Sequence, residues 1–82
     1  MEDNGTTAAA ELLGFDVGKA SHWVCGLDGA GRVVLSERVA NRPAEIDAVL
    51  AGAAPGALVA VDQKRNIGAL VVERARAAGN PV

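Results

Sequence analysis

"GFDVGK" (residues 14–19) places a carboxylate at the end of an apolar run and follows it at once with glycine and lysine. The run itself, "ELLGFDV" (11–17), is hydrophobic at both parities, as in a strand that is covered on both faces. A lone ionised carboxylate in an apolar setting is costly unless something pairs with it. We therefore expect Asp16 either at an exposed strand end or at a place where a ligand or metal ion holds it.

Two short strands are predicted directly downstream. "SHWVCGL" (21–27) alternates in polarity, and we expect Trp23, Cys25 and Leu27 to share its core face. "DGAG" (28–31) carries the Asp-Gly signal of a tight hairpin, with a second glycine available for positive φ. Because the connections are short, the three strands form an antiparallel meander, with strands near 11–17, 21–27 and 32–39.

The second half of the chain alternates helix and strand. Asn41 is the expected N-cap of a helix whose first turn contains Pro43. "ALVAVD" (57–62) repeats the opening pattern, an apolar strand that ends in aspartate. Asn66 is the expected N-cap of the second helix and Gly79 its C′ residue, after which "NPV" is typical of the first step into another strand. The helices are expected near 43–51 and 66–79, and the fourth strand near 57–62.

This order of elements, β-β-β-α-β-α, is that of an incomplete ribonuclease-H-like α/β fold with a mixed sheet. Its expected strand order is 3-2-1-4, with strand 4 parallel to strand 1. Adjacent strands lie roughly 4.8 Å apart, so Asp16 and Asp62 are expected to converge at one edge of the sheet. The expected core residues are Leu13, Phe15, Trp23, Val33, Leu35, Leu58, Val59, Ile67, Leu70 and Val71.

Composition narrows the class of protein. The 82 residues allow one small domain of modest stability, and the net charge of −2 lacks the strongly basic character of most nucleic-acid-binding domains. A single cysteine, Cys25, excludes an internal disulfide and fits a reducing cytosol. The polar opening (1–10) is expected to be a disordered lead-in, and no apolar stretch approaches membrane-spanning length. We therefore predict a soluble cytoplasmic protein without a membrane partner.

Asp16 and Asp62 are the candidate catalytic and metal-binding residues. Two carboxylates held close together repel each other unless a cation lies between them. Oxygen ligands of this kind suit Mg²⁺, or Mn²⁺ in its place, which binds through one or two carboxylates and keeps several waters. The alternative is that both aspartates merely mark where strands enter loops.

The chain resembles the amino-terminal part of the DEDD transposases of the IS-one-ten group, whose catalytic domain is RuvC-like. The resemblance is carried by "GFDVGKASHWVCGLDGAGRVV", "NRPAEIDAVL", "VAVDQ" and "NIGALVVERARAAGNPV", and it covers almost all of the chain from Leu13 onward. It implies that residues 11–82 belong to a RuvC-like domain whose first two catalytic acids match Asp16 and Asp62. For the full-length parent it implies metal-dependent cleavage and exchange of DNA at insertion-sequence ends, with a guide RNA and a homo-oligomer as further expected partners.

The sequence departs from the family pattern at three points. The second acid is Asp62 where the family has glutamate, and Lys64-Arg65 stands where the family tends to small residues or proline. The third and fourth acids and the domain with the catalytic serine match nothing in these 82 residues. From these departures we expect a truncated transposase that binds metal weakly, is marginally stable and is inactive alone.

Basic and polar residues near the acids are secondary candidates. Lys19, Lys64 and Arg65 are predicted to contact DNA phosphates, against the alternative of solvated side chains. His22 and Gln63 stand close to the acids in sequence, and their roles are left open.

Two other classes of function remain open at this point. "GFDVGK" is also similar to the first phosphate loop of sugar kinases, Hsp70 and actin, although Lys19 stands where those proteins want serine or threonine. The third class is a non-catalytic scaffold domain that uses the same fold.

Overall fold

The structure is a computed structural model that describes residues 9–62 and 67–82. Four strands and two helices follow one another in the predicted order β-β-β-α-β-α. They are β1 (Leu12–Asp16), β2 (Ser21–Leu27), β3 (Val33–Ala40), α1 (Pro43–Gly52), β4 (Leu58–Asp62) and α2 (Ala69–Ala77). No helix among the described residues is long and apolar enough to cross a membrane.

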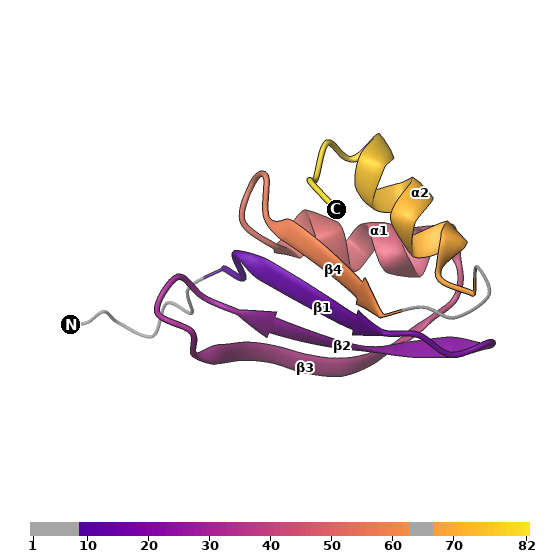
Figure 1. Ribbon diagram of the computed structural model, residues 1–82, viewed down its shortest axis with the longest axis horizontal. Coiled ribbons are helices and arrows are strands. Elements are labelled where there is room, and N and C mark those ends of the chain that lie inside the picture. Colours follow the sequence, from indigo (N-terminus) through magenta and orange to yellow (C-terminus); the bar gives the residue numbers. More distant parts are fainter. Residues whose placement is uncertain (1–8, 63–66) are drawn as a thin grey trace.

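The four strands form one mixed sheet in the order β3-β2-β1-β4, which confirms the predicted topology (Figure 1). β1 pairs antiparallel with β2 and parallel with β4, and β2 pairs antiparallel with β3. The chain thus has the incomplete ribonuclease-H-like α/β architecture that the order of elements predicts.

Both helices pack on the same side of the sheet, and in Figure 1 α1 passes behind β4 while α2 stands above β4 in the view. α1 packs against β3 and α2, and α2 packs against β4. The core fills the layer between helices and sheet, and its side chains come from every element. It consists of Ala10, Leu13, Phe15, Val24, Val39, Ile46, Leu50, Val59, Val71 and Ala75.

The core prediction is wrong for three residues, because the helices cover only one face of the sheet. Trp23 is 50% exposed, Val33 62% and Leu58 48%. The β2 residues of the opposite parity lie on the face toward the helices and are buried, namely His22, Val24 and Gly26. The face of β2 that was expected to form the core therefore lies on the open side of the sheet.

The remaining predicted core residues lie between the sheet and the helices and are buried or partly buried. Leu13, Phe15, Val59 and Val71 are buried, as predicted. Leu35 and Leu70 are partly buried and pack against this core, and Ile67 is half-buried.

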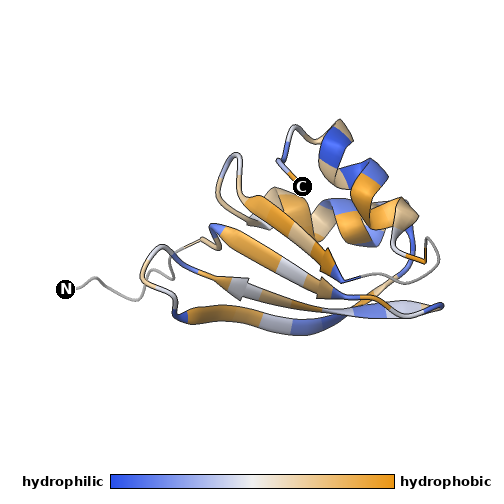
Figure 2. Ribbon diagram, viewed as in Figure 1, coloured by the Kyte–Doolittle hydropathy of each residue, from blue (hydrophilic) through white to orange (hydrophobic). Residues whose placement is uncertain are grey.

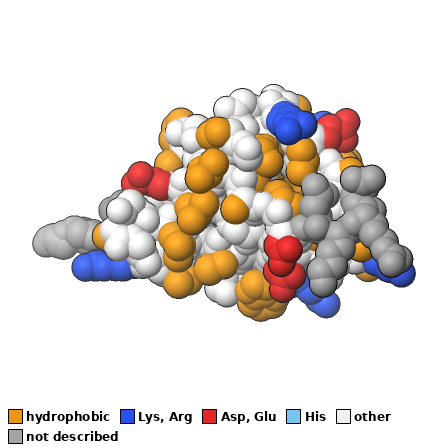
Figure 3. Space-filling view, viewed as in Figure 1, with side chains coloured by type: hydrophobic (Ala, Val, Ile, Leu, Met, Phe, Trp, Pro, Cys, Tyr) orange, Lys and Arg blue, Asp and Glu red, His pale blue; other side chains and the backbone are white. Residues whose placement is uncertain are grey.

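The open face of the sheet carries hydrophobic side chains beside charged ones. Figure 3 shows hydrophobic groups running across this face, with acidic and basic groups near the end where the strands β1 and β4 finish. Figure 2 shows the same change along the ribbon, since β1 and β4 are hydrophobic through their length and hydrophilic at their tips.

The hairpin between β2 and β3 has the predicted turn chemistry. The Asp28 carboxylate accepts hydrogen bonds from the backbone N–H groups of Ala30 and Arg32, each at 2.9 Å. Gly31 takes a positive φ of 83°, a conformation that glycine adopts without a Cβ clash.

α1 begins at Pro43 as predicted, whereas its cap and the start of α2 differ from the prediction. The N-cap of α1 is Arg42, with Pro43 at the first helical position, and the Asn41 side chain caps nothing. The N-cap of α2 is Gly68, so the helix starts three residues later than expected. Asn66, the predicted cap, lies outside the described residues.

The end of α2 follows the prediction. Gly79 has a φ of 86° in the C′ position. The Gly79 N–H donates to the Arg76 carbonyl and the Asn80 N–H donates to the Ala75 carbonyl, which is the Schellman arrangement. The chain then runs along the outer edge of β4, where the Val59 N–H donates to the Pro81 carbonyl at 2.8 Å.

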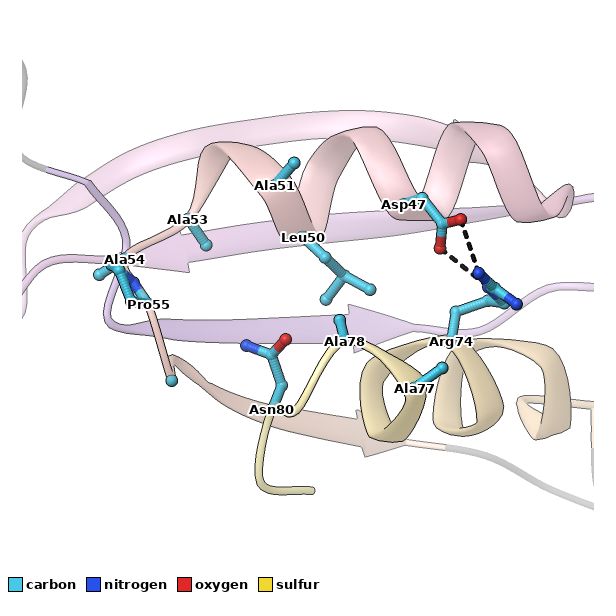
Figure 4. Close-up of a pocket in the computed structure, with 11 residues that line it drawn as sticks. Asp47, Leu50, Ala51, Ala53, Ala54, Pro55, Arg74, Ala77, Ala78 and Asn80 are labelled. Atoms are coloured by element: carbon cyan, nitrogen blue, oxygen red, sulfur yellow. Dashed lines mark hydrogen bonds and ion pairs between the residues drawn. The ribbon is translucent and has the colours of Figure 1, made fainter.

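A bidentate ion pair links the two helices. Arg74 Nε and Nη2 donate to the two carboxylate oxygens of Asp47 at 2.9 and 2.8 Å (Figure 4). The hydrogen bonds from Arg74, with its positive charge, hold the pKa of Asp47 below its usual value. The same pair raises the pKa of the Arg74 guanidinium.

The one-sided core predicts unequal costs for two leucine deletions. Leu13→Ala should destabilise the fold by about 2–5 kcal/mol, because the side chain is fully buried and leaves a cavity. Leu58→Ala should cost about 1 kcal/mol, since about half of that side chain is already in water. Urea unfolding of the two variants measures the difference. Equal losses would show that the open face is covered in solution.

The Asp47–Arg74 pair predicts a pH-dependent coupling between the helices. Its carboxyl has a lower pKa folded than unfolded, so the pair stabilises above about pH 4 and loses this contribution as the pH falls through the folded-state value. A double-mutant cycle with Asp47→Asn and Arg74→Gln should give a coupling at about pH 7 that falls as the pH is lowered through the folded-state pKa of Asp47. An unchanged coupling at acid pH would contradict this assignment.

Candidate functional site

Asp16 and Asp62 are register partners at the ends of neighbouring parallel strands. Asp16 is the last residue of β1 and Asp62 the last of β4, and their Cα atoms are paired in the ladder. The arrowheads of β1 and β4 accordingly reach the same edge of the sheet (Figure 1). The two candidate acids are therefore brought together, one on each strand.

Both aspartates lie on the open face of the sheet. Asp16 and Asp62 are exposed, whereas the preceding residue of each strand, Phe15 or Val61, points toward the helices. The carboxylate that follows the apolar run of β1 therefore lies at an exposed strand end. Alternation along the strand places Phe15 in the core and Asp16 in solvent, so the charge is not desolvated.

Small residues leave room beside the carboxylates. Gly14 and Ala60 are also register partners, two residues before the aspartates on the same face of the sheet. Together with Asp16 and Asp62 they border an open hollow of about 390 Å³ on the sheet surface. The sequence indicates this hollow, because a small residue stands two positions before each aspartate.

The same row continues across the sheet with an aromatic and a basic residue. Trp23 is the β2 partner of Asp16, and Arg38 is the β3 partner of Trp23. The indole N–H of Trp23 donates to the Ser36 hydroxyl at 3.0 Å, which fixes the orientation of the half-exposed ring. Trp23 and Arg38 are neighbours of the candidate site that the sequence did not predict, because Trp23 was assigned to the core.

The candidate cations lie in different parts of the chain. Lys19 is exposed in the turn 17–20, which connects β1 to β2 directly after Asp16. Lys64 and Arg65, together with Gln63, lie outside the described residues. Their predicted contacts with DNA phosphates remain predictions.

His22 is the sequence candidate whose surroundings differ most from expectation. Its side chain is 2% exposed and faces the helices, on the opposite side of the sheet from the two carboxylates. Nδ1 lies 3.2 Å from the Gly18 backbone nitrogen and Nε2 lies 2.9 Å from the Asn41 Oδ1 atom. With both ring nitrogens engaged inside the fold, His22 is neither a metal ligand nor a base at this site.

The donor set that the described residues offer to a metal ion consists of two carboxylates. No group of three or more histidine, cysteine or acidic side chains that could hold an ion occurs within residues 9–62 and 67–82. Two exposed carboxylates on paired strands fit a hard divalent cation such as Mg²⁺, which retains water in its other positions. These two carboxylates would form part of a metal centre and would not complete its coordination sphere.

A second hollow lies at the opposite end of β4, between the helices (Figure 4). It has a volume of about 380 Å³, and alanine residues form much of its wall. Its polar side chains are already bonded within the chain, Asp47 to Arg74 and Asn80 Nδ2 to the Ala57 carbonyl at 2.8 Å. This hollow is a gap at the end of the core and shares no residue with the aspartate pair.

Comparison with known proteins gives a family match over most of the chain. Residues 13–82 match the family model of the IS110-type DEDD transposases, described as a transposase. The chain is 44% identical over 71 residues to an uncharacterized 43.6 kDa protein of insertion element IS110 from Streptomyces coelicolor. That alignment covers 83% of this chain and 18% of the relative, so the chain spans less than a fifth of the protein it matches. No solved structure matches the chain. Because the family model covers nearly all of the described sheet and both helices, the chain belongs to the IS110 family of DEDD transposases.

Proposed function

We propose that this chain supplies the first two acids of a metal-dependent centre for DNA cleavage and strand exchange in the transposition of an insertion sequence. The observation that carries the proposal is the register pairing of Asp16 with Asp62 at the ends of β1 and β4. Membership of a transposase family supports DNA as the partner and favours this function over an ATPase phosphate loop or a non-catalytic scaffold.

Asp16 and Asp62 would hold one divalent ion, Mg²⁺ or Mn²⁺, through their carboxylate oxygens. When bound, such an ion stabilises negative charge that develops on the oxygens of a phosphodiester. The protein's own contribution is to fix both carboxylates on strands, to keep the space over Gly14 and Ala60 open, and to carry Lys19 beside them. Lys19, Lys64 and Arg65 are the proposed contacts to DNA phosphates.

The 82-residue chain is proposed to be inactive by itself. Two carboxylates leave most of the coordination sphere to water and substrate phosphates, so we expect the chain alone to bind the ion weakly. The chain spans 18% of its relative, and the sequence resemblance matches the first two acids of the family, and not the third and fourth, to its residues. We infer that the third and fourth acids, and the serine that would form a covalent intermediate with DNA, belong to other parts of the longer protein.

Titration with Mn²⁺ tests the metal site directly. The paramagnetic ion should broaden the amide resonances at residues 14–16 and 60–62, with weak affinity. Asp16→Asn or Asp62→Asn should each lower the affinity by about tenfold or more, because each removes one of the two charged ligands. Glu73→Gln, which removes an exposed carboxylate from α2, is the matched control and should leave the broadening unchanged. Broadening in the Asp16→Asn, Asp62→Asn double variant equal to that in the unaltered chain would contradict the proposal.

An assay of strand cleavage tests the proposed inactivity. The purified 82-residue chain, supplied with Mg²⁺ or Mn²⁺ and a DNA element end, should neither cleave nor exchange strands. Supply of the longer protein should give activity that disappears with Asp16→Asn. Activity of the short chain that depends on Asp16 would contradict the view that two acids are insufficient.

A further inference from the structure

His22 carries a buried imidazole that lies apart from the two carboxylates. It is the one histidine of the chain, and it lies in the core layer with its ring edge-on to Phe15, at a centroid distance of 6.5 Å and an angle of 81°. A polar ring buried among apolar side chains costs free energy unless both nitrogens find partners. An apolar side chain of similar volume would avoid this cost, so the position of His22 calls for a reason other than packing.

The partners of His22 define its protonation. The Gly18 backbone N–H is a donor only, so Nδ1 must accept at 3.2 Å and carries no proton. The proton therefore resides on Nε2, which donates to the Asn41 Oδ1 atom at 2.9 Å. This fixes the Asn41 amide as well, because its Nδ2 group then points to the Lys19 carbonyl, 3.4 Å away. The arrangement needs a neutral ring in one tautomer.

His22 and Asn41, which bond each other, both also bond the loop 17–20. The segment 17–20 follows Asp16 directly and carries Lys19. Gly18 is held by His22, the Lys19 carbonyl by the Asn41 side chain, and the Ala20 carbonyl by the Asn41 N–H at 3.0 Å. A Cβ on Gly18 would collide with the Ser21 carbonyl oxygen, so the loop conformation itself requires glycine. Gly18 is thereby tied to β2, and Lys19 and Ala20 are tied to Asn41 in the link between β3 and α1.

We propose that His22 and Asn41 are positioning residues that clamp the loop 17–20 and hold Lys19 beside Asp16 for contact with a nucleic-acid phosphate. The role of Lys19 rests on the proposed function, whereas the clamp rests on the hydrogen bonds alone. His22 acts from the covered face of the sheet, and the loop that it holds emerges at the end where the carboxylates lie. The tautomer of one buried ring thus controls the placement of an exposed cation.

Two amide variants separate the two bonds of the ring. His22→Asn places an acceptor near the position of Nδ1 and can keep the bond from Gly18, but it is too short to reach Asn41. His22→Gln reaches the position of Nε2 and can keep the bond to Asn41, but it loses the bond from Gly18. The two side chains have the same chemistry, so a difference between them reports on the clamp rather than on burial of a polar group.

Hydrogen exchange and NMR relaxation give the decisive measurements. The Gly18 amide should exchange about tenfold faster in His22→Gln than in the unaltered chain and at a nearly unaltered rate in His22→Asn, because one hydrogen bond is lost only in the former. The Lys19 amide should become more mobile in Asn41→Ala, which leaves the core histidine in place. In the unaltered chain, the nitrogen shifts of His22 should show an unprotonated Nδ1 and a protonated Nε2.

Two results would overturn the clamp. One is a proton on Nδ1 in the unaltered chain, a measurement that requires no variant to fold. The other is equal Gly18 exchange and Lys19 mobility in all the variants, which would leave His22 as a core residue only.

A DNA titration at low salt separates the clamp from the function it serves. A duplex oligonucleotide should shift the resonances of residue 19, and the shift should weaken in Lys19→Gln, which removes the cation, and in Asn41→Ala, which releases the Lys19 carbonyl. Absence of any shift in the unaltered chain would contradict the role given to Lys19 under the proposed function, while the exchange rate of Gly18 would still decide the clamp.

Discussion

The parallel pairing of β1 with β4 is the constraint on which the rest of the molecule depends. It joins the amino-terminal meander to the α/β half of the chain, and it sets the order β3-β2-β1-β4. Its register matches Leu13 with Val59 in the core and Asp16 with Asp62 at the exposed end. A slip of one residue would turn Val59 outward and Asp62 inward, so burial of the core and convergence of the acids require the same alignment. Stability and the candidate site are therefore specified by one set of backbone hydrogen bonds.

The order of elements was predictable because its signals are local. Asp-Gly marks the hairpin, Pro43 marks the start of α1 and Gly79 marks the end of α2, and each keeps that role in the fold. The core face of β2 was not predictable in the same way. In the sequence the more apolar parity is the one with Trp23, but the covered face is fixed by where α1 and α2 pack, and it carries His22 and Val24. The helices cover the face with the smaller side chains and leave Trp23 half-exposed beside Asp16.

Asn41 shows how a tertiary demand overrides a local preference. As an N-cap it would add about 1 kcal/mol to α1, and its position before Pro43 favours that role. As the partner of a buried imidazole it removes a penalty of about 1–3 kcal/mol for an unpaired polar group, and it bonds the Lys19 carbonyl as well. Pairing with His22 stabilises the fold more than capping would, so α1 begins at Pro43 with Arg42 as an N-cap that makes no side-chain bond. No sequence pattern indicates this exchange, because His22 and Asn41 are 19 residues apart.

The candidate site combines two means of holding a charged group in place. The carboxylates of Asp16 and Asp62 are fixed by the sheet, since each terminates a strand whose neighbours are paired. Lys19 lies on a loop without ladder bonds, and an exposed lysine on such a loop would ordinarily sample many positions. Here His22 bonds the Gly18 N–H and Asn41 bonds the Lys19 carbonyl, so the backbone that follows Asp16 has partners outside the ladder. Under the proposed function, a lysine that contacts a DNA phosphate gains from such order before the substrate arrives, because ordering it during binding would reduce the affinity.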